Sequence, residues 1–241
     1  MKLIPDNSID LVVTSPPYNC GIKYDSYNDD KEWKEYYLWC RTWLQEIYRV
    51  LKDDGRFCLN HYLSLGQSNN RHAPLMKLNE MCMEMGYKHH GIAIWTDITL
   101  IKRTAWGSWI SASAPYVNSP YEGILILYKN EWKKQRSGES TIDKKRFMQL
   151  CSGIWKMQPE MKGMTIANFP LELPSNCINL LSYKGDTVLD PFMGSGTTAV
   201  ACKQLQRNFI GFEISQMYVD IANKRLQQET IFEYVLDKEE Y

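Results

Sequence analysis

The chain lacks the long apolar runs and the charge excess that mark several large protein classes. No apolar run approaches the roughly 18 residues that a membrane helix needs, and the first residues contain no signal-peptide core. We therefore expect no membrane partner. The formal net charge is zero, so bulk electrostatics does not favour a polyanion, although a local basic patch still can.

Cysteine pairs and histidine clusters are also missing. The 7 cysteines are scattered without a CxxC pair, and the 4 histidines include one adjacent pair. Zinc sites and disulfide frameworks both need closer or more regular spacing. This distribution is typical of reduced core thiols in a cytoplasmic protein, and it predicts no metal site.

The composition and the apolar spacing predict one α/β domain that covers residues 1–241. Hydrophobic residues make up 44% of it, which is ordinary globular usage. Apolar spacing alternates between the helical and the strand period, which predicts a Rossmann-like, mainly parallel sheet with helices on both faces. Helices are predicted within 31–52, 73–86, 173–182, 196–206 and 215–228, and strands within 8–15, 56–62, 89–95, 121–129, 186–190 and 208–214.

The stretch TSPPYN (14–19) directly follows the first predicted strand. Proline cannot donate to a sheet ladder, and it restricts the residue before it, so two prolines end the strand and stiffen the turn. The turn carries the hydroxyl of Ser15, the carbonyls of Pro16 and Pro17, and the ring of Tyr18. We expect such a rigid turn to position weak hydrogen-bond acceptors.

A second signal is TVLDPFMGSGTTAVA (187–201), in which a short strand ends at Asp190 and a helix begins near Thr197. Glycines between them let a ligand approach the backbone, and the helix start offers unpaired N–H groups. Glu213 ends the next predicted strand, where a carboxylate can accept the hydroxyl hydrogens of a ribose. The pattern predicts a site for a nucleoside cofactor.

The identity of that nucleoside stays open at this point. Gly194, Gly196 and Ala199 fit GxGxxA, so a nicotinamide dinucleotide and an oxidoreductase remain alternatives, as does a structural glycine turn. Asp190 would repel a diphosphate. It favours a ligand with an ammonium group, such as the methionine end of S-adenosylmethionine.

Four stretches resemble one family. DPFMGSGTT (190–198) resembles the cofactor motif of DNA amino-methyltransferases, and TSPPY (14–18) resembles their catalytic motif. NFPLELPSNCINLL (168–181) and AWGSWISASAPYVNSPYEGILILYK (105–129) are similar to further segments, the latter to one of N4-cytosine members. The likeness covers nearly the whole chain, in the permuted, β-class order. It implies a circularly permuted S-adenosylmethionine-dependent methyltransferase fold with a catalytic half (1–100), an inserted target-recognition region (101–165) and a cofactor half (166–241).

The resemblance implies a role for each matching residue. The catalytic residues would be Ser15, Pro16, Pro17 and Tyr18. The implied cofactor residues are Phe169, Asp190, Pro191, Phe192, Gly194, Ser195, Gly196, Thr197, Thr198 and Glu213.

In the implied reaction, an exocyclic amine of a flipped base attacks the sulfonium methyl group of S-adenosylmethionine. Ser15 Oγ and the Pro16 carbonyl would accept the two N–H groups of the amine, and Tyr18 would stack on the base, which is worth ~1–3 kcal/mol. Methylation at ring carbon C5 needs a cysteine nucleophile, and the chain has no Pro-Cys dipeptide. By resemblance, serine in the first motif position leans towards N4 of cytosine, with N6 of adenine as the alternative.

The expected partner is duplex DNA. The basic residues of the central region are predicted to contact its phosphates: Lys102, Arg103, Lys133, Lys134 and Arg136. A catalytically silent DNA-binding module is the rival interpretation. A homodimer and a cognate restriction endonuclease acting on the same site are implied by resemblance only.

The beginning of the chain departs from the family pattern. Relatives carry an upstream strand that ends near an acidic residue, which contacts the adenine of the cofactor. Here ten residues or fewer precede the first apolar run. We expect either that the start is internal to a longer reading frame or that the adenine of the cofactor is held differently. The sheet then lacks one strand, or TIFEYVL (230–236) contributes to that edge. We expect weaker cofactor affinity than in full-length relatives.

Overall fold

The computed structural model describes residues 1–24, 26–67, 70–96, 107–117, 121–160 and 169–236. Its centre is a seven-stranded sheet of order β7-β5-β6-β2-β1-β8-β9, in which β6 alone of these seven runs opposite to its neighbours. A separate two-stranded hairpin is formed by β3 and β4. The strands are β1 (Ile9–Thr14), β2 (Leu51–Tyr62), β3 (Leu65–Gln67), β4 (Asn70–His72), β5 (Lys88–Thr96), β6 (Glu122–Tyr128), β7 (Ile154–Lys156), β8 (Thr187–Asp190) and β9 (Asn208–Gly211).

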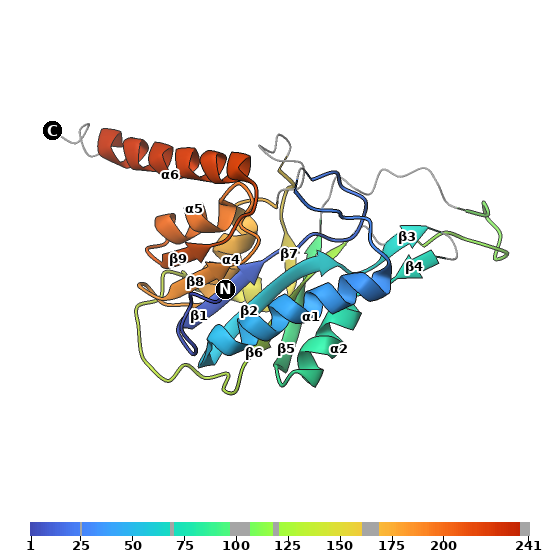
Figure 1. Cartoon of the computed structure of the whole chain (residues 1–241), viewed down its shortest axis with the longest axis horizontal. Helices are drawn as coiled ribbons and strands as arrows, with labels where there is room; N and C mark the ends of the chain where they lie inside the picture. The colour runs from blue at the N-terminus through green and yellow to red at the C-terminus, as the bar shows by residue number, and fades with distance from the viewer. Residues whose placement is uncertain (25, 68–69, 97–106, 118–120, 161–168, 237–241) are drawn as a thin grey trace.

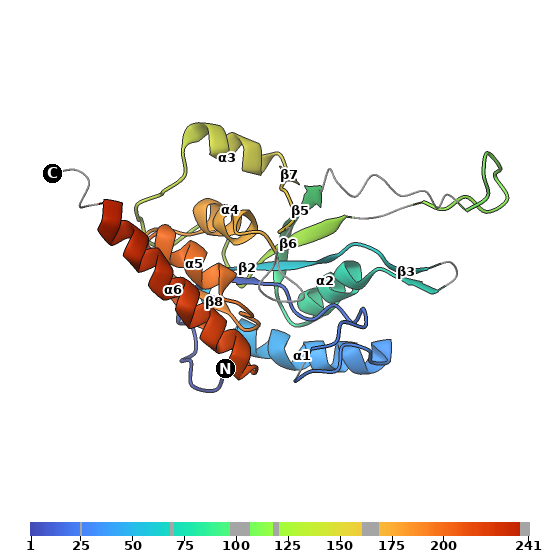
Figure 2. The same ribbon diagram turned by 90° about the horizontal axis from the view of Figure 1, so that it is seen from above.

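Helices cover both faces of this sheet (Figures 1 and 2). On β1, Val12 packs with the helices of one face, whereas Leu11 and Val13 pack with those of the other, because successive strand side chains alternate. The first face holds α1 (Trp33–Val50) and α2 (Pro74–Glu84), and the second holds α3 (Lys144–Cys151), α4 (Glu172–Leu181) and α5 (Thr197–Gln204). The last helix, α6 (Gln216–Leu236), contacts α5.

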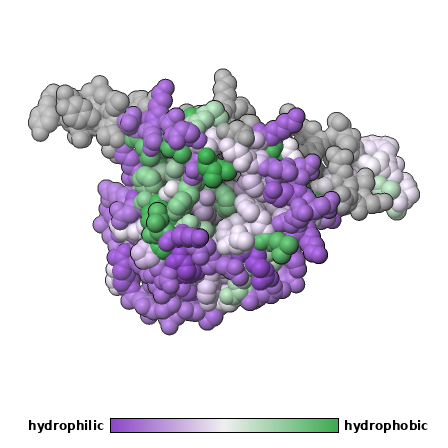
Figure 3. Space-filling view, in the orientation of Figure 1, coloured by the Kyte–Doolittle hydropathy of each residue, from purple (hydrophilic) through white to green (hydrophobic). Residues whose placement is uncertain are grey.

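The predicted fold class is confirmed. The long amphipathic helix α1 illustrates how the apolar spacing in the sequence led to this prediction. In α1 the residues at helical spacing, among them Tyr36, Cys40, Leu44 and Ile47, are completely buried against the sheet. On the face seen in Figure 3, hydrophilic side chains cover the lower part, and apolar ones gather beneath α6. Within the part of the chain that the structure describes, no helix has the length and apolar character to cross a bilayer.

The structure bears on two expectations about the edges of the fold. Within the predicted target-recognition region (101–165), the predicted strand β6 pairs with both β2 and β5, and β7 extends the sheet beyond β5; the role of this region stays a prediction. Only residues 107–117 of its described part project away from the body, on the same side as the β3–β4 hairpin (Figures 1 and 2). The suggestion that 230–236 forms a sheet edge is wrong, since these residues lie in α6.

The topology brings the two motif loops together. Strands β1 and β8 are parallel neighbours, with Leu11 opposite Val188 and Val12 opposite Leu189. The turn after Thr14 and the loop after Asp190 therefore leave the same edge of the sheet side by side. Strand β9, which runs parallel beside β8, delivers the residues up to Glu213 to that edge.

Candidate active site

The Pro-Pro turn is held in place by side chains of α1 and β2. The hydroxyl of Tyr36 in α1 donates to the Pro17 carbonyl at 2.8 Å and lies 3.1 Å from His61 Nε2. The ring of Tyr18 packs on His61, with 4.2 Å between centroids. Burial lowers the pKa of His61 to about 3, so this histidine is neutral at physiological pH. Buried neutral groups thus fix the turn in one geometry.

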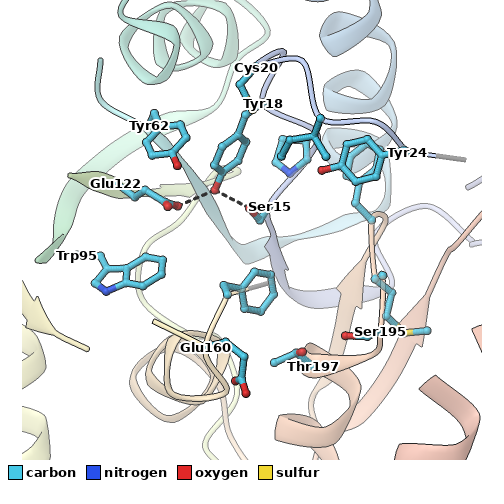
Figure 4. A pocket seen from close by; sticks show the side chains of 16 residues that line it. Ser15, Tyr18, Cys20, Tyr24, Tyr62, Trp95, Glu122, Glu160, Ser195 and Thr197 are labelled. Carbon is cyan, nitrogen blue, oxygen red and sulfur yellow. Dashed lines mark hydrogen bonds between the residues drawn. The ribbon is translucent and has the colours of Figure 1, made fainter. Parts of the chain in front are cut away.

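A cavity of about 320 Å³ opens beside this turn. Its wall carries Glu122, the first residue of β6, whose Oε2 accepts hydrogen bonds from the Tyr18 hydroxyl at 2.8 Å and from Asn60 Nδ2 at 2.7 Å. Ser15 Oγ lies 2.6 Å from the same Tyr18 hydroxyl, on its other side (Figure 4). Tyr62 and Trp95 add flat apolar surface to the cavity. A planar heterocycle fits such a lining.

Glu122, Asn60, Tyr62 and Trp95 were missed by the sequence interpretation. Glu122 stands 104 positions from Tyr18 in the chain, and no spacing rule joins residues so far apart. The only available signal was that Glu122 opens a predicted strand, which does not say which strand end it would meet.

The glycine loop after β8 forms the other wall. Gly194 has a φ of +52°, and a Cβ built on it would meet no atom within 4 Å, so its backbone faces open space. Gly196 has a φ of +81°, and a Cβ there would lie 2.8 Å from that of Ala222, so α5 can approach α6 only with glycine at this position. The Glu213 carboxylate accepts from the Gly194 N–H at 2.9 Å and from the N–H groups of Ile214 and Ser215 at 2.8 Å.

A second cavity, of about 330 Å³, lies next to the first. Both cavities are lined by Ser15, Tyr24, Phe192 and Gly194, so they meet at the junction of the two motif loops. The second cavity is further lined by Pro191, Phe212, Glu213, Trp39 and Tyr218. A nucleoside fits this mixture of aromatic walls and one carboxylate.

Comparison with known proteins decides the family. A family model for DNA methylases of the N6/N4 type matches residues 9–224. The chain belongs to this DNA methylase family. Its fold is that of S-adenosylmethionine-dependent methyltransferases, as in its solved-structure neighbours.

Individual relatives of the methylase agree with this assignment. The Type II methyltransferase M.MjaVI of Methanocaldococcus jannaschii is 42% identical over 161 residues, which cover 66% of this chain and 81% of that protein. M.HpaI of Haemophilus parainfluenzae is 28% identical over 95% of this chain and 71% of its own length. A DNA modification methylase from Thermus thermophilus, solved with S-adenosylmethionine, has 26% identity and a TM-score of 0.74, and the alignment covers 95% of this chain and 89% of that one.

Asp190 of the methylase lies beneath the glycine loop and lines neither cavity. Its carboxylate accepts from the hydroxyls of Thr14 and Thr198, both at 2.6 Å, and from the Phe192 N–H at 3.0 Å. Burial raises its pKa to about 6. Asp190 ties the end of β1 to the start of α5. A carboxylate can accept about four hydrogen bonds, so the contact of Asp190 with an ammonium group stays a prediction.

The remaining loop residues divide between cavity wall and support. Ser195 is buried and accepts from Arg225 at 3.0 Å through Oγ, while Thr197 Oγ1 accepts from the same guanidinium at 3.0 Å. Thr198 is buried against Asp190. The lining of the first cavity includes Pro16, Phe169, Ser195 and Thr197, and that of the second includes Pro17.

The basic residues predicted to bind DNA do not gather at the cavities. The Lys134 side chain is 4% exposed, and its Nζ lies 3.6 Å from Asp186 and 3.8 Å from Asp10, near the amino ends of β8 and β1. Arg136 pairs with the same Asp186, and Lys133 directly precedes Lys134 in the chain. Burial and pairing remove Lys134 from the predicted DNA surface of the methylase. Lys102 and Arg103 lie outside the described residues.

No group of three or more His, Cys, Asp or Glu side chains in the described ranges has the geometry to hold a metal ion. The polar groups at the cavities are instead hydroxyls, backbone groups and carboxylates. This donor set suits hydrogen bonding to a nucleoside and to a base.

Proposed function

We propose that the chain is a site-specific DNA methyltransferase that transfers a methyl group from S-adenosylmethionine to the exocyclic N4 of cytosine in duplex DNA. The observation that carries the proposal is the pair of cavities that share Ser15, Phe192 and Gly194. The second cavity suits a nucleoside and the first a flat base. A methyl group at their junction would therefore move only a short way from the cofactor to the base. The order of the motifs along the chain favours the permuted, β-class arrangement.

The second cavity would hold S-adenosylmethionine, with which the Thermus thermophilus relative was solved. Glu213 lines this cavity, and its carboxylate can accept ribose hydroxyl hydrogens in addition to its backbone partners. Trp39, Phe192 and Phe212 provide apolar surface for the adenine. The cofactor supplies an electrophilic methyl group on a positively charged sulfur.

The first cavity would receive the target base after it leaves the duplex, at a cost of a few kcal/mol. There the Ser15 hydroxyl and the Pro16 carbonyl would accept the amine hydrogens, which keeps the nitrogen lone pair directed at the methyl group. Tyr18 would stack on the base. The rigid turn matters because these are weak acceptors whose value depends on placement before the substrate arrives.

Serine rather than aspartate in the first motif position favours cytosine N4, and adenine N6 is the alternative. The test is to methylate a plasmid with the purified protein and S-adenosylmethionine, digest it to nucleosides and identify the modified base by mass spectrometry. N4-methylcytosine would bear out the proposal, and N6-methyladenine would establish the alternative. Absence of any methylated nucleoside would overturn both.

For the DNA path we propose the β3–β4 hairpin and residues 107–117, in place of the 133–136 segment. The hairpin follows Tyr62 and the second segment precedes Glu122, and both of these residues line the base cavity. The two projections touch, since the Arg71 guanidinium lies 4.4 Å from the ring centroid of Tyr116.

Matched substitutions test this path. We expect Arg71→Ala to weaken DNA binding and to lower the slope of log affinity against log salt by about 1. Lys133→Ala should leave both quantities unchanged, although it removes the same charge from an exposed position. If fluorescence anisotropy titrations show weaker binding for Lys133→Ala and unchanged binding for Arg71→Ala, the DNA path follows the basic segment instead.

The Type II names of the relatives extend the proposal to a restriction–modification system with a cognate endonuclease, acting in the cytoplasm. A homodimer stays a prediction, which light scattering of the purified protein would test.

A further inference from the structure

A chain of short hydrogen bonds crosses the base cavity. It runs from Ser15 Oγ to the Tyr18 hydroxyl, over 2.6 Å, and from that hydroxyl to Glu122 Oε2, over 2.8 Å (Figure 4). Asn60 Nδ2 supports it by donating to both the Tyr18 oxygen and Glu122, at 2.8 and 2.7 Å. Two segments far apart in the sequence thus form one connected line of oxygen atoms, which a side-chain nitrogen of β2 supports.

The direction of each bond in this line follows from the groups themselves. An ionised carboxylate can only accept, so the single hydrogen of the Tyr18 hydroxyl points at Glu122. Tyr18 therefore has no hydrogen left for Ser15, and the Ser15 hydroxyl must be the donor in their pair. The remaining lone pairs of Ser15 Oγ are then available to accept from a group in the cavity.

We propose that Glu122 is the final proton acceptor of the methyl transfer, reached from the substrate amine through the hydroxyls of Ser15 and Tyr18. The proposal rests on the methyltransferase function proposed above. It gives Glu122 a part in catalysis, and it explains how a serine, which is a poor base by itself, can serve where a proton has to be removed.

The bond from the amine nitrogen to the methyl carbon forms while the sulfonium sulfur–methyl bond breaks, and the sulfur keeps the electron pair. The nitrogen, which now carries the positive charge, loses one hydrogen as a proton to Ser15 Oγ. Ser15 passes its own proton to Tyr18, and Tyr18 passes its own to Glu122, which becomes a neutral carboxylic acid. After the product leaves, Glu122 returns the proton to water.

The surroundings of Glu122 suit a proton acceptor. The titratable groups next to it are Tyr18 and Tyr62, with His61 behind the Tyr18 ring; the cavity lining further includes Glu160, Tyr24 and Cys20. No lysine or arginine is among the described residues that line this cavity, so none of them contributes a fixed positive charge that would hold Glu122 ionised. Loss of solvation raises the pKa of Glu122, and it also keeps Tyr18 in its neutral, proton-relaying form by raising the pKa of that phenol.

The main test compares wild type with Glu122→Gln in single-turnover methylation at saturating DNA and S-adenosylmethionine. Glutamine retains an oxygen that accepts from Tyr18 and Asn60 but cannot take up the proton. We expect the rate to fall about 100-fold or more while the affinities for both substrates stay the same. The wild-type rate should rise with pH as Glu122 ionises, and the variant should lack this rise. Glu122→Asp should recover part of the rate.

A double-mutant cycle tests the path. Tyr18→Phe keeps the ring but removes the relaying hydroxyl, so it should be slow as well. The Tyr18→Phe/Glu122→Gln double variant should be no slower than the worse single variant, because both changes cut the same path. Additive losses would overturn the relay. Glu131→Gln, an exposed change just after β6, serves as the matched control with unchanged rate.

A measurement without cofactor or DNA completes the design. Infrared difference spectra of the protein alone across a pH series should contain a protonated-carboxyl band that Glu122→Gln lacks and that persists above the ordinary pKa of glutamate. Absence of this band overturns the proposal, as does a Glu122→Gln variant with the wild-type rate and pH profile. If wild type methylates no DNA while the band is present, the proposed function fails instead, and the two failures are thereby distinguished.

Discussion

The hydroxyl of Tyr36 offers a direct test of the idea that buried contacts fix the Pro-Pro turn. It donates to the Pro17 carbonyl at 2.8 Å, and the side chain is completely buried. We assign the proton of the neutral His61 to Nε2, because the single hydrogen of Tyr36 is directed at Pro17 and the 3.1 Å contact of Nε2 with Tyr36 is shorter than the 3.4 Å contact of Nδ1 with the Tyr62 carbonyl. Tyr36→Phe removes only this oxygen and leaves the ring in place.

The expected cost has two parts. Losing the bond to Pro17 costs about 0.5–1.5 kcal/mol of the free energy of unfolding, and leaving the buried His61 N–H without a partner costs about 1–3 kcal/mol. The sum of roughly 2–4 kcal/mol lies within the stability of an ordinary domain, so the variant should fold. The loosened turn should also slow the single-turnover methylation rate by about 10- to 100-fold, since small displacements of positioning groups are costly.

Urea unfolding and single-turnover methylation measure the two effects. The matched control is Tyr87→Phe, which removes another buried hydroxyl, bonded at 2.8 Å to the carbonyl of Leu44, further along α1 than Tyr36. It should lose stability but not rate. If Tyr36→Phe slows methylation no more than Tyr87→Phe does, the reasoning about the turn is refuted.

Two further predictions concern buried charges. The pKa of Asp190 is raised from 3.8 to about 6, so its stabilising contribution is present below about pH 4 and is lost as pH rises through 6. Relative to Asp190→Asn, the wild-type free energy of unfolding in urea titrations should therefore fall by about 2–3 kcal/mol between pH 4 and 7. Parallel pH curves for the two proteins would contradict this. Lys134→Met should destabilise the protein by about 1–3 kcal/mol, because Asp10 and Asp186 each lose one buried cationic partner but keep Lys52 and Arg136. DNA affinity in anisotropy titrations should stay the same; weakened DNA binding with unchanged stability would support the original interpretation of Lys134.

The sequence predicted those elements whose signal is local. The helical spacing of Tyr36, Cys40 and Leu44 indicated α1, and β-branched runs bounded by proline or glycine indicated β1 and β8. It missed β7 and the β3–β4 hairpin, which are short strands of three residues each. Segments of that length carry too few residues for a period to be recognised, and pairing with a neighbouring strand decides them.

The same division holds for the side chains. The basic segment was interpreted by its charge alone, but a lysine contacts phosphate only if its partner carboxylates lie elsewhere, and Asp10 and Asp186 lie beside Lys134. Asp190 was correctly predicted to end a strand next to the glycine loop. Its hydrogen bonds to Thr14 and Thr198 depend on which strand is its neighbour.

By itself, the sequence determined the alternation of strands and helices, the stiff turn at residues 14–18 and the glycine loop at 190–198, because each of these depends on backbone preferences of adjacent residues. Only the tertiary structure decided that the turn and the loop share one edge, that Glu122 stands within hydrogen-bonding distance of Tyr18, and that Lys134 is buried. Such contacts join residues as far apart as Thr14 and Asp190, 176 positions along the chain, and their geometry is set by strand order and packing.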